Sequence, residues 1–157
     1  MASEEARSQA GTDFPHEPRS APRDRFATAA ETGALPVWRP VPLVALNEAT
    51  RNMRSRWIIP PIDGGSDYSV SEWELISAGW SDHHAHDELN YVLRGELHIE
   101  CEGRTVVLGP GEAALVPKGR TGRYWAPEYA RMIAVYGPNT EGEISEYLDY
   151  WEFGDGA

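Results

Sequence analysis

Short apolar runs separated by turn residues dominate the chain between residues 68 and 138. Within these runs, apolar and polar residues alternate with a period of two, which is typical of strands that bury one face. The runs are not separated by the long helical patterns that a parallel α/β sheet needs. The pattern therefore predicts an all-β sandwich or barrel, with strands near 68–77, 82–93, 96–101, 104–108, 112–116, 121–126 and 130–136.

Turn and breaker residues mark where the predicted strands end. Arg94-Gly95 and Glu102-Gly103 are expected to be tight hairpin turns. Upstream, prolines within residues 35–46 exclude a helix interior and predict an extended segment at a sheet edge. Residues 47–54 are expected to form one helical turn or a loop, and residues 57–61 a short strand that ends at proline.

The acidic end of the chain leaves two structures open. Four large residues of the segment 141–151 lie at helical spacing, and they are Ile144, Tyr147, Leu148 and Trp151. A short terminal helix could therefore pack on the barrel through these side chains. An extended segment fits the same sequence nearly as well.

Composition divides the chain into four parts. Residues 1–34 are rich in Ala, Ser, Pro, Glu and Arg without an apolar period, which predicts a disordered leader. Residues 35–67 are expected to form an N-terminal arm and loop, and residues 68–138 a single β-barrel. Residues 139–157 form an acidic C-terminal segment with six acids and no Lys or Arg.

Charge and cysteine content narrow the classes of function. The net charge of −11 disfavours binding to a nucleic-acid backbone, so we expect no nucleic-acid partner. The first 30 residues lack the apolar core of a signal peptide, and no window of about 18 apolar residues exists, so we expect no membrane partner. Cys101 is the single cysteine, which excludes an intrachain disulfide. We expect a soluble, cytoplasmic protein.

The densest candidate chemistry lies in the segment from Asp82 to Asn90, which contains three histidines and Glu88. Imidazole and carboxylate groups are the side chains that hold divalent transition metals. If residues 82–92 form one extended strand, five side chains share one face, and these are Asp82, His84, His86, Glu88 and Asn90. His83 then points to the other face.

The same segment resembles the first motif of the cupin superfamily, in which a His-x-His pair precedes Glu and then Gly. Glu88 and Gly95 have the right separation, His84 takes the place of the second histidine, and Asp82 that of the first. Residues 109–119 resemble the second cupin motif, whose terminal histidine would fall at Gly122. The resemblance covers residues 68–138 and implies a single cupin-type jelly-roll β-barrel.

Within the superfamily, residues 87–98 and 116–119 look most like the ethanolamine-utilisation cupin group. That group has a first motif poor in histidine and a second motif without the terminal histidine. Gly122 agrees with this pattern, whereas His84 and His86 depart from it. The resemblance also implies homodimers, an accessory role in small-molecule catabolism and, more weakly, acetate-kinase-like activity.

These observations predict a divalent transition metal, either Zn, Fe, Mn or Ni, held by His84, His86 and Glu88, with Asp82 as a substitute ligand. Glu88 could instead act as a general base if the histidines alone hold the ion. Tyr124 shares the parity of Gly122 and is expected to pack rather than to bind metal. A metal-free polar pocket is the alternative.

The predicted function is a small metal-dependent enzyme that acts on a small polar or carboxylate-bearing molecule in the barrel. Isomerase, lyase, hydrolase and oxygenase chemistry all stay open, because a fold does not fix a reaction. The alternative is a non-catalytic ligand-binding or accessory barrel without a metal. The chain has no phosphate loop of the GxxxxGK[ST] type to support nucleotide binding.

Overall fold

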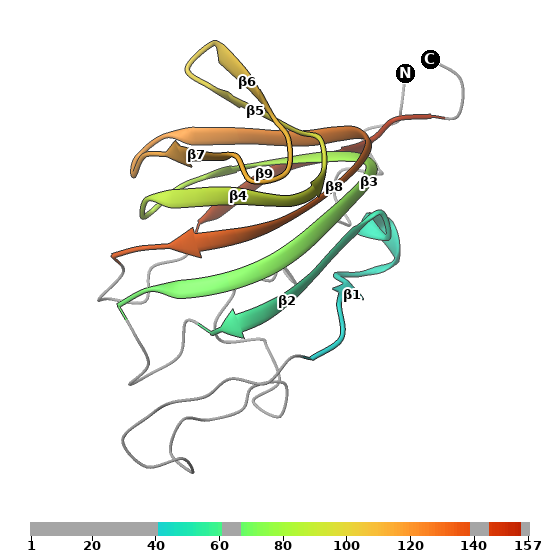
Figure 1. Ribbon diagram of the computed structural model, residues 1–157, viewed down its shortest axis with the longest axis horizontal. Helices are drawn as coiled ribbons and strands as arrows, with labels where there is room; N and C mark the ends of the chain where they lie inside the picture. Colours follow the sequence, from blue (N-terminus) through green and yellow to red (C-terminus); the bar gives the residue numbers. More distant parts are fainter. Residues whose placement is uncertain (1–40, 61–66, 139–144, 155–157) are drawn as a thin grey trace.

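The computed structural model describes residues 41–60, 67–138 and 145–154, which are almost entirely β-structure (Figure 1). The all-β prediction is confirmed. Residues 1–40, which include the predicted leader, lie outside the described residues. In chain order the elements are β1 (Val44–Ala45), the 3-10 helix η4 (Glu48–Thr50), β2 (Met53–Ile59), β3 (Ser69–His83), β4 (Glu88–Gly95), β5 (Leu97–Cys101), β6 (Arg104–Leu108), β7 (Ala113–Val116), β8 (Thr121–Tyr136) and β9 (Glu146–Glu152).

Two long antiparallel strands, β3 and β8, run through both layers of the fold. The first half of β3 pairs with β2, and the second half of β8 pairs with β4, which also pairs with β7. The second half of β3 pairs with β9, and the first half of β8 pairs with β5 of the β5–β6 hairpin (Figure 1). Among the described residues these pairings do not close into a ring.

The lengths of β3 and β8 differ from the prediction. The strand expected to end at residue 77 continues to His83, and the strands expected at 121–126 and 130–136 are one strand. The physical reason is a bulge, where the β3–β8 register shifts between Ile76 and Ala78 and Ser77 has a φ of 47°. A bulge bends a strand without ending it, so local turn signals there suggest a break that does not exist.

The same bulge lets both halves of β3 contribute to the core. Before it, Trp73 and Leu75 are buried, and after it, Ala78 and Trp80 are buried. An extra residue in one strand turns the following side chains to the opposite face, so the buried positions change from odd to even numbers. The even-numbered face continues to Asp82, which brings a carboxylate into the barrel.

Of the two predicted hairpin turns, one is confirmed and one is wrong. Glu102-Gly103 joins β5 to β6, and the adjoining residues Cys101 and Arg104 pair directly. Arg94-Gly95 does not make a hairpin, because β4 and β5 each pair with β8 rather than with each other. The chain passes here from one layer to the other, a long-range choice that the local glycine signal does not reveal.

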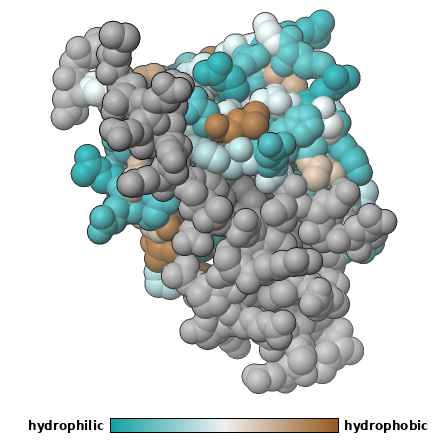
Figure 2. All heavy atoms as spheres, turned by 180° about the vertical axis from the view of Figure 1, so that it is seen from behind, coloured by the Kyte–Doolittle hydropathy of each residue, from teal (hydrophilic) through white to brown (hydrophobic). Residues whose placement is uncertain are grey.

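The end of the chain adopts the extended alternative. β9 pairs with the second half of β3, and the ring of Tyr147 packs on Trp80 at a centroid distance of 5.5 Å. Residues 141–144, where the helical pattern began, lie outside the described residues. Seen from behind, the described surface shows small hydrophobic patches among hydrophilic atoms (Figure 2). The described residues contain no helix with the length and apolar character needed to cross a membrane.

Candidate metal centre

The candidate site forms where β3 ends and β4 begins. A loop of residues 84–87 joins the two strands, and its backbone is fixed by the turn that precedes β8. The His84 amide donates to the carbonyl of Arg120 at 2.9 Å, and the Gly119 amide donates to the carbonyl of His84 at 2.8 Å. The Lys118 amide donates to Asp87 Oδ1 at 2.7 Å. These bonds hold the loop against the turn.

The single strand predicted over residues 82–93 is wrong, because the loop interrupts it. The predicted alternation of burial nevertheless continues across the loop, although its backbone bends at residues 85 and 86. His83 is exposed, as expected from its parity, and lies 3.2 Å from Thr121 Oγ1. The inward-facing residues are all buried, and they are Asp82, His84, His86, Glu88 and Asn90.

His84 lies at the centre of this group, between two carboxylates. Its Nε2 atom is 3.1 Å from Asp82 Oδ1, and its Nδ1 atom is 3.2 Å from Glu88 Oε2. The hydroxyl of Tyr124 lies 2.8 Å from Nε2, and that of Ser145 lies 3.4 Å from Nδ1. Both ring nitrogens of His84 are therefore in contact with polar groups.

The donor set fits a divalent transition ion. Asp82, His84 and Glu88 each offer a ligand atom, and these three atoms lie within 4.8 Å of one another. Both Asp82 oxygens and Glu88 Oε2 are buried and accept no well-directed hydrogen bond. Buried carboxylate oxygens without donors are costly in a folded protein, and coordination of a cation is one way to satisfy them.

Asn90 completes the wall next to Glu88. Its Nδ2 atom donates to Glu88 Oε1 at 2.9 Å, while its own Oδ1 atom is buried and accepts no hydrogen bond. The amide therefore fixes one oxygen of Glu88 and leaves the other directed at His84. An outer hydrogen bond of this kind orients a ligating carboxylate.

The pKa values of His84 and Glu88 depend on each other, because the two side chains are in contact. Burial lowers the pKa of His84, but the charges of Glu88 and Asp82 outweigh this effect and raise it to about 9. Burial raises the pKa of Glu88 to about 7, a shift that His84 opposes and Asp82 reinforces. Near neutral pH the imidazole thus carries a proton that a metal ion would displace.

His86, the third predicted ligand, is buried beside the group rather than within it. Its ring centroid lies 6.2 Å from that of His84 and 5.4 Å from that of Tyr136. The converging ligand atoms come from Asp82, His84 and Glu88, and His86 is not among these three residues. The predicted pair His84 and Glu88 thus meets in the structure, with Asp82 in the place expected for His86.

Sequence reasoning missed the contact of Ser145 with His84, whereas Tyr124 packs in the core as expected and places its hydroxyl beside His84. Ser145 directly precedes β9 and reaches the site because β9 pairs with the end of β3. Such a long-range placement leaves no local pattern. The direction of the Tyr124 side chain could be expected from the sequence, because Tyr124 shares the parity of Gly122. Gly122 is the residue opposite Asp82 in the β3–β8 pairing.

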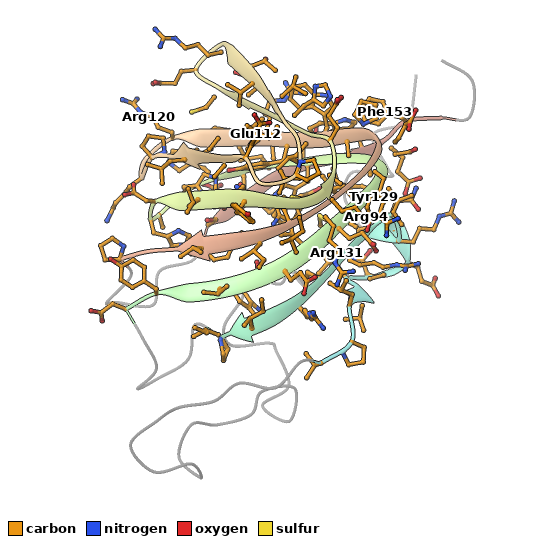
Figure 3. All side chains as sticks on the ribbon, viewed as in Figure 1. Arg94, Glu112, Arg120, Tyr129, Arg131 and Phe153 are labelled. Atoms are coloured by element: carbon orange, nitrogen blue, oxygen red, sulfur yellow. The ribbon has the colours of Figure 1, made fainter. Side chains whose placement is uncertain are left out.

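The other candidate residues lie outside this group. His98 stacks on Trp125 at a centroid distance of 5.2 Å, and Cys101 packs against the core. Arg131 pairs with the buried carboxylate of Glu72. Figure 3 shows Arg131 beside Arg94 and Tyr129, whereas Arg120 lies at the other end of the sheet, where it pairs with Glu102.

Comparison with known proteins identifies the fold. An RmlC-like cupin from Shewanella frigidimarina superposes with a TM-score of 0.53 at 18% identity, over 64% of this chain and 86% of that chain. The chain has the cupin fold. The family model described as ethanolamine utilisation protein EutQ matches residues 68–141 of this cupin. A putative ethanolamine utilization protein Q from Salmonella typhimurium superposes with a TM-score of 0.51 at 26% identity, over 56% of this chain and 71% of that chain.

The similarity to curated relatives covers only part of this chain. The protein named acetate kinase EutQ from Clostridioides difficile is 42% identical over 53 residues, which are 34% of this chain and 34% of the relative. The chain thus spans about a third of the length of that relative. The cupin is therefore EutQ-like over residues 68–141, and β9 lies beyond the matched range.

Proposed function

We propose that this cupin is a small metal-dependent enzyme that acts on a small polar or carboxylate-bearing molecule in the barrel. The observation that carries the proposal is the buried convergence of Asp82, His84 and Glu88, in which both Asp82 oxygens and Glu88 Oε2 accept no well-directed hydrogen bond. These three residues would hold the ion. A bound divalent ion would supply a Lewis acid that polarises a carbonyl or carboxylate group, or activates a water molecule.

The protein residues would bind and orient the reactants around that ion. Asn90 holds Glu88 Oε1 in place, so the carboxylate can present Oε2 either as a ligand or as a general base. The pKa of Glu88, raised to about 7 by burial, suits proton exchange near neutral pH. The ring of Tyr124 packs edge-on against His84, and Trp73 packs edge-on against Tyr124.

Charge links the metal to the proposed class of substrate. Without an ion, the site contains two carboxylates and one imidazole, which together repel an anion even when His84 is protonated. A divalent cation reverses this balance and lets a substrate carboxylate approach. The arginines at positions 120 and 131 pair with Glu102 and Glu72, so they offer no substitute charge within the site.

The second candidate is a non-catalytic binding or accessory cupin without a metal. His84 favours it, because a protonated imidazole between Asp82 and Glu88 satisfies part of the buried charge by itself. Such a pocket retains a negative charge and would prefer a neutral or cationic ligand. Acetate-kinase-like activity is a weaker proposal, because the named relatives match over only about a third of their length.

Metal-dependent turnover separates the enzyme from the binding module. We would incubate metal-stripped and metal-loaded protein with a panel of small hydroxy and keto carboxylates and follow the mixtures by proton NMR. Glu88→Gln serves as the matched variant, because it keeps the shape of the side chain and removes its charge. Turnover by loaded wild-type protein that the variant lacks supports the enzyme. Binding of panel members without turnover in any metal state supports the binding module.

We also propose that the protein forms homodimers through the outer face of β4 and β7. Four apolar side chains are exposed on this face, at fractions of 37% to 53%, and they are Leu89, Tyr91, Leu93 and Leu115. Leu89 and Leu115 are direct cross-strand partners, so the apolar surface is continuous between the two strands. Contiguous exposed apolar surface of this kind is typical of protein interfaces.

A further inference from the structure

We propose that Tyr124 is a positioning residue that occupies the place of a fourth metal ligand and holds His84 through its hydroxyl group. This inference rests on the proposed metal site and names a residue that shapes it. The support comes from three observations, which are the register of β3 and β8, the space above Gly122 and the contact between Tyr124 and His84.

The register places position 122 at the metal centre. Asp82 on β3 pairs directly with Gly122 on β8, and both residues are buried. A side chain at position 122 would therefore share the inner face with Asp82 and project toward the same group. This geometry is independent of any resemblance to other proteins, and it makes position 122 a natural source of another ligand.

The phenol ring of Tyr124 fills the space that such a side chain would need. A Cβ atom placed on Gly122 would lie 2.3 Å from Tyr124 Oη and 2.6 Å from both Cε2 and Cζ. These separations are far shorter than any van der Waals contact. The position of the Tyr124 ring therefore requires a glycine at position 122, because the ring lies over that residue on the same strand.

The hydroxyl group of Tyr124 contacts His84. It lies 2.8 Å from His84 Nε2, and the side chain of Tyr124 is fully buried. Trp73 fixes the ring from the side, with its centroid 5.7 Å away in an edge-on arrangement.

A hydroxyl group in contact with one ring nitrogen can fix the orientation of a histidine side chain. Hydrogen bonds from neighbouring groups orient ligating imidazoles, and their loss commonly weakens metal binding by about 10- to 100-fold. Tyr124 would therefore fix the orientation of His84 while leaving the coordination of the ion incomplete. Incomplete protein coordination is the property that catalytic metal sites share.

The test compares two conservative variants that each remove one buried hydroxyl. Tyr124→Phe keeps the ring over Gly122 and removes the contact with His84. Tyr136→Phe is the control, because its hydroxyl lies 2.8 Å from Ser71 Oγ. Metal affinity is measured by calorimetry with Zn²⁺ and Mn²⁺, and the ring nitrogens of His84 are observed by ¹⁵N NMR in metal-free protein at a fixed pH.

We expect Tyr124→Phe to shift the His84 Nε2 resonance and to weaken metal binding by about 10- to 100-fold. Tyr136→Phe should leave both within the error of the wild-type values. Equal affinity and an unchanged His84 resonance in Tyr124→Phe would overturn the role of Tyr124 while the metal site stands. Wild-type protein that binds neither ion would instead overturn the proposed function on which this role rests.

A second pair of variants tests, without any metal, whether the Tyr124 ring occupies the space of a side chain at position 122. Gly122→Ala should lower the melting temperature of the wild-type protein by several degrees, because its Cβ atom meets the phenol. In a Tyr124→Leu background, which lacks the outer ring atoms, the same substitution should cost little or nothing. Equal losses in the two backgrounds would show that Tyr124 does not occupy the place of a side chain at position 122.

Discussion

His84 and Glu88 face each other across the loop between β3 and β4, with His84 Nδ1 3.2 Å from Glu88 Oε2. Both side chains are buried, and Asp82 approaches the other ring nitrogen at 3.1 Å. The imidazole is therefore the group that keeps two buried carboxylates together. Its removal would leave like charges facing each other in a medium that screens them poorly.

We expect His84→Ala to weaken binding of a divalent transition ion by at least 100-fold and to lower the free energy of unfolding by about 3 kcal/mol at pH 8. The adjacent exposed residue His83 offers a matched control, since His83→Ala should change neither quantity by a measurable amount. Calorimetric titration and urea unfolding provide the two readouts. Loss of the metal in His86→Ala but not in His84→Ala would contradict the ligand set.

Metal binding should depend on pH through displaced protons. Because the pKa of His84 is raised to about 9, an entering ion must displace its proton throughout the neutral range. Between pH 7 and pH 9, where Glu88 is ionised, affinity should rise about tenfold per pH unit, with one proton released for each ion bound. Below pH 7, Glu88 also carries a proton, so the dependence should steepen.

Titrations in buffers of different ionisation enthalpy count these protons directly. We expect one released proton at pH 8 and close to two at pH 6. A histidine with the ordinary pKa of about 6.5 would instead lose its metal only below that pH. An affinity that is constant between pH 7 and pH 9 would show that the carboxylates do not raise the pKa of His84.

The main features of the fold were predictable because they are encoded locally. Alternation in segments such as Leu97–Cys101 reports one buried face, and Glu102-Gly103 is a turn sequence in its own right. The inward direction of His84 and Glu88 followed from the same parity, which persisted through the loop. The local pattern is therefore enough to locate the candidate site without the pairing of the strands.

The features that could not be predicted depend on long-range pairing. The bulge at Ser77 changes the parity of β3, and its position is visible only in the register with β8. Ser145 reaches His84 through the pairing of β9 with β3, although it lies 61 residues away along the chain. His86 was assigned by parity alone, which gives the direction of a side chain but not the convergence of its atoms.

The C-terminal strand β9 should stabilise the site through a contact with Gly79. A Cβ atom on Gly79 would lie 2.3 Å from ring atoms of Trp151 and 2.7 Å from Trp125 Cβ. We expect Gly79→Ala to displace Trp151, to loosen β9 and to lower the free energy of unfolding by about 1–3 kcal/mol. Ser145 would then leave His84, so metal affinity should fall as well.

The control for this prediction is Gly154→Ala, because a Cβ atom there meets nothing within 4 Å. Urea unfolding and metal titration of both variants provide the comparison. If Gly79→Ala is as stable as Gly154→Ala, then Trp151 does not pack over Gly79. If stability falls while metal affinity is unchanged, β9 supports the barrel but not the site.

The exposed apolar face of β4 and β7 should hold two copies of the chain together. We expect light scattering at micromolar concentration to give the mass of a dimer for the wild-type protein. Leu115→Lys, which places a charge in the middle of the face, should give a monomer. Val107→Lys on the β5–β6 hairpin changes a similarly exposed residue outside this face and should stay dimeric. A monomeric wild-type protein would exclude the proposed interface.

The central proposal is that Asp82, His84 and Glu88 bind one divalent transition ion per chain. The most direct test is elemental analysis of the protein after loading with Zn²⁺, Mn²⁺, Fe²⁺ or Ni²⁺ and removal of free metal at pH 8. We predict close to one ion per chain for the wild-type protein and almost none for His84→Gln, with a matched His83→Gln protein retaining the wild-type content. A folded wild-type protein that retains no ion after loading would contradict the metal centre and leave the metal-free binding barrel in its place.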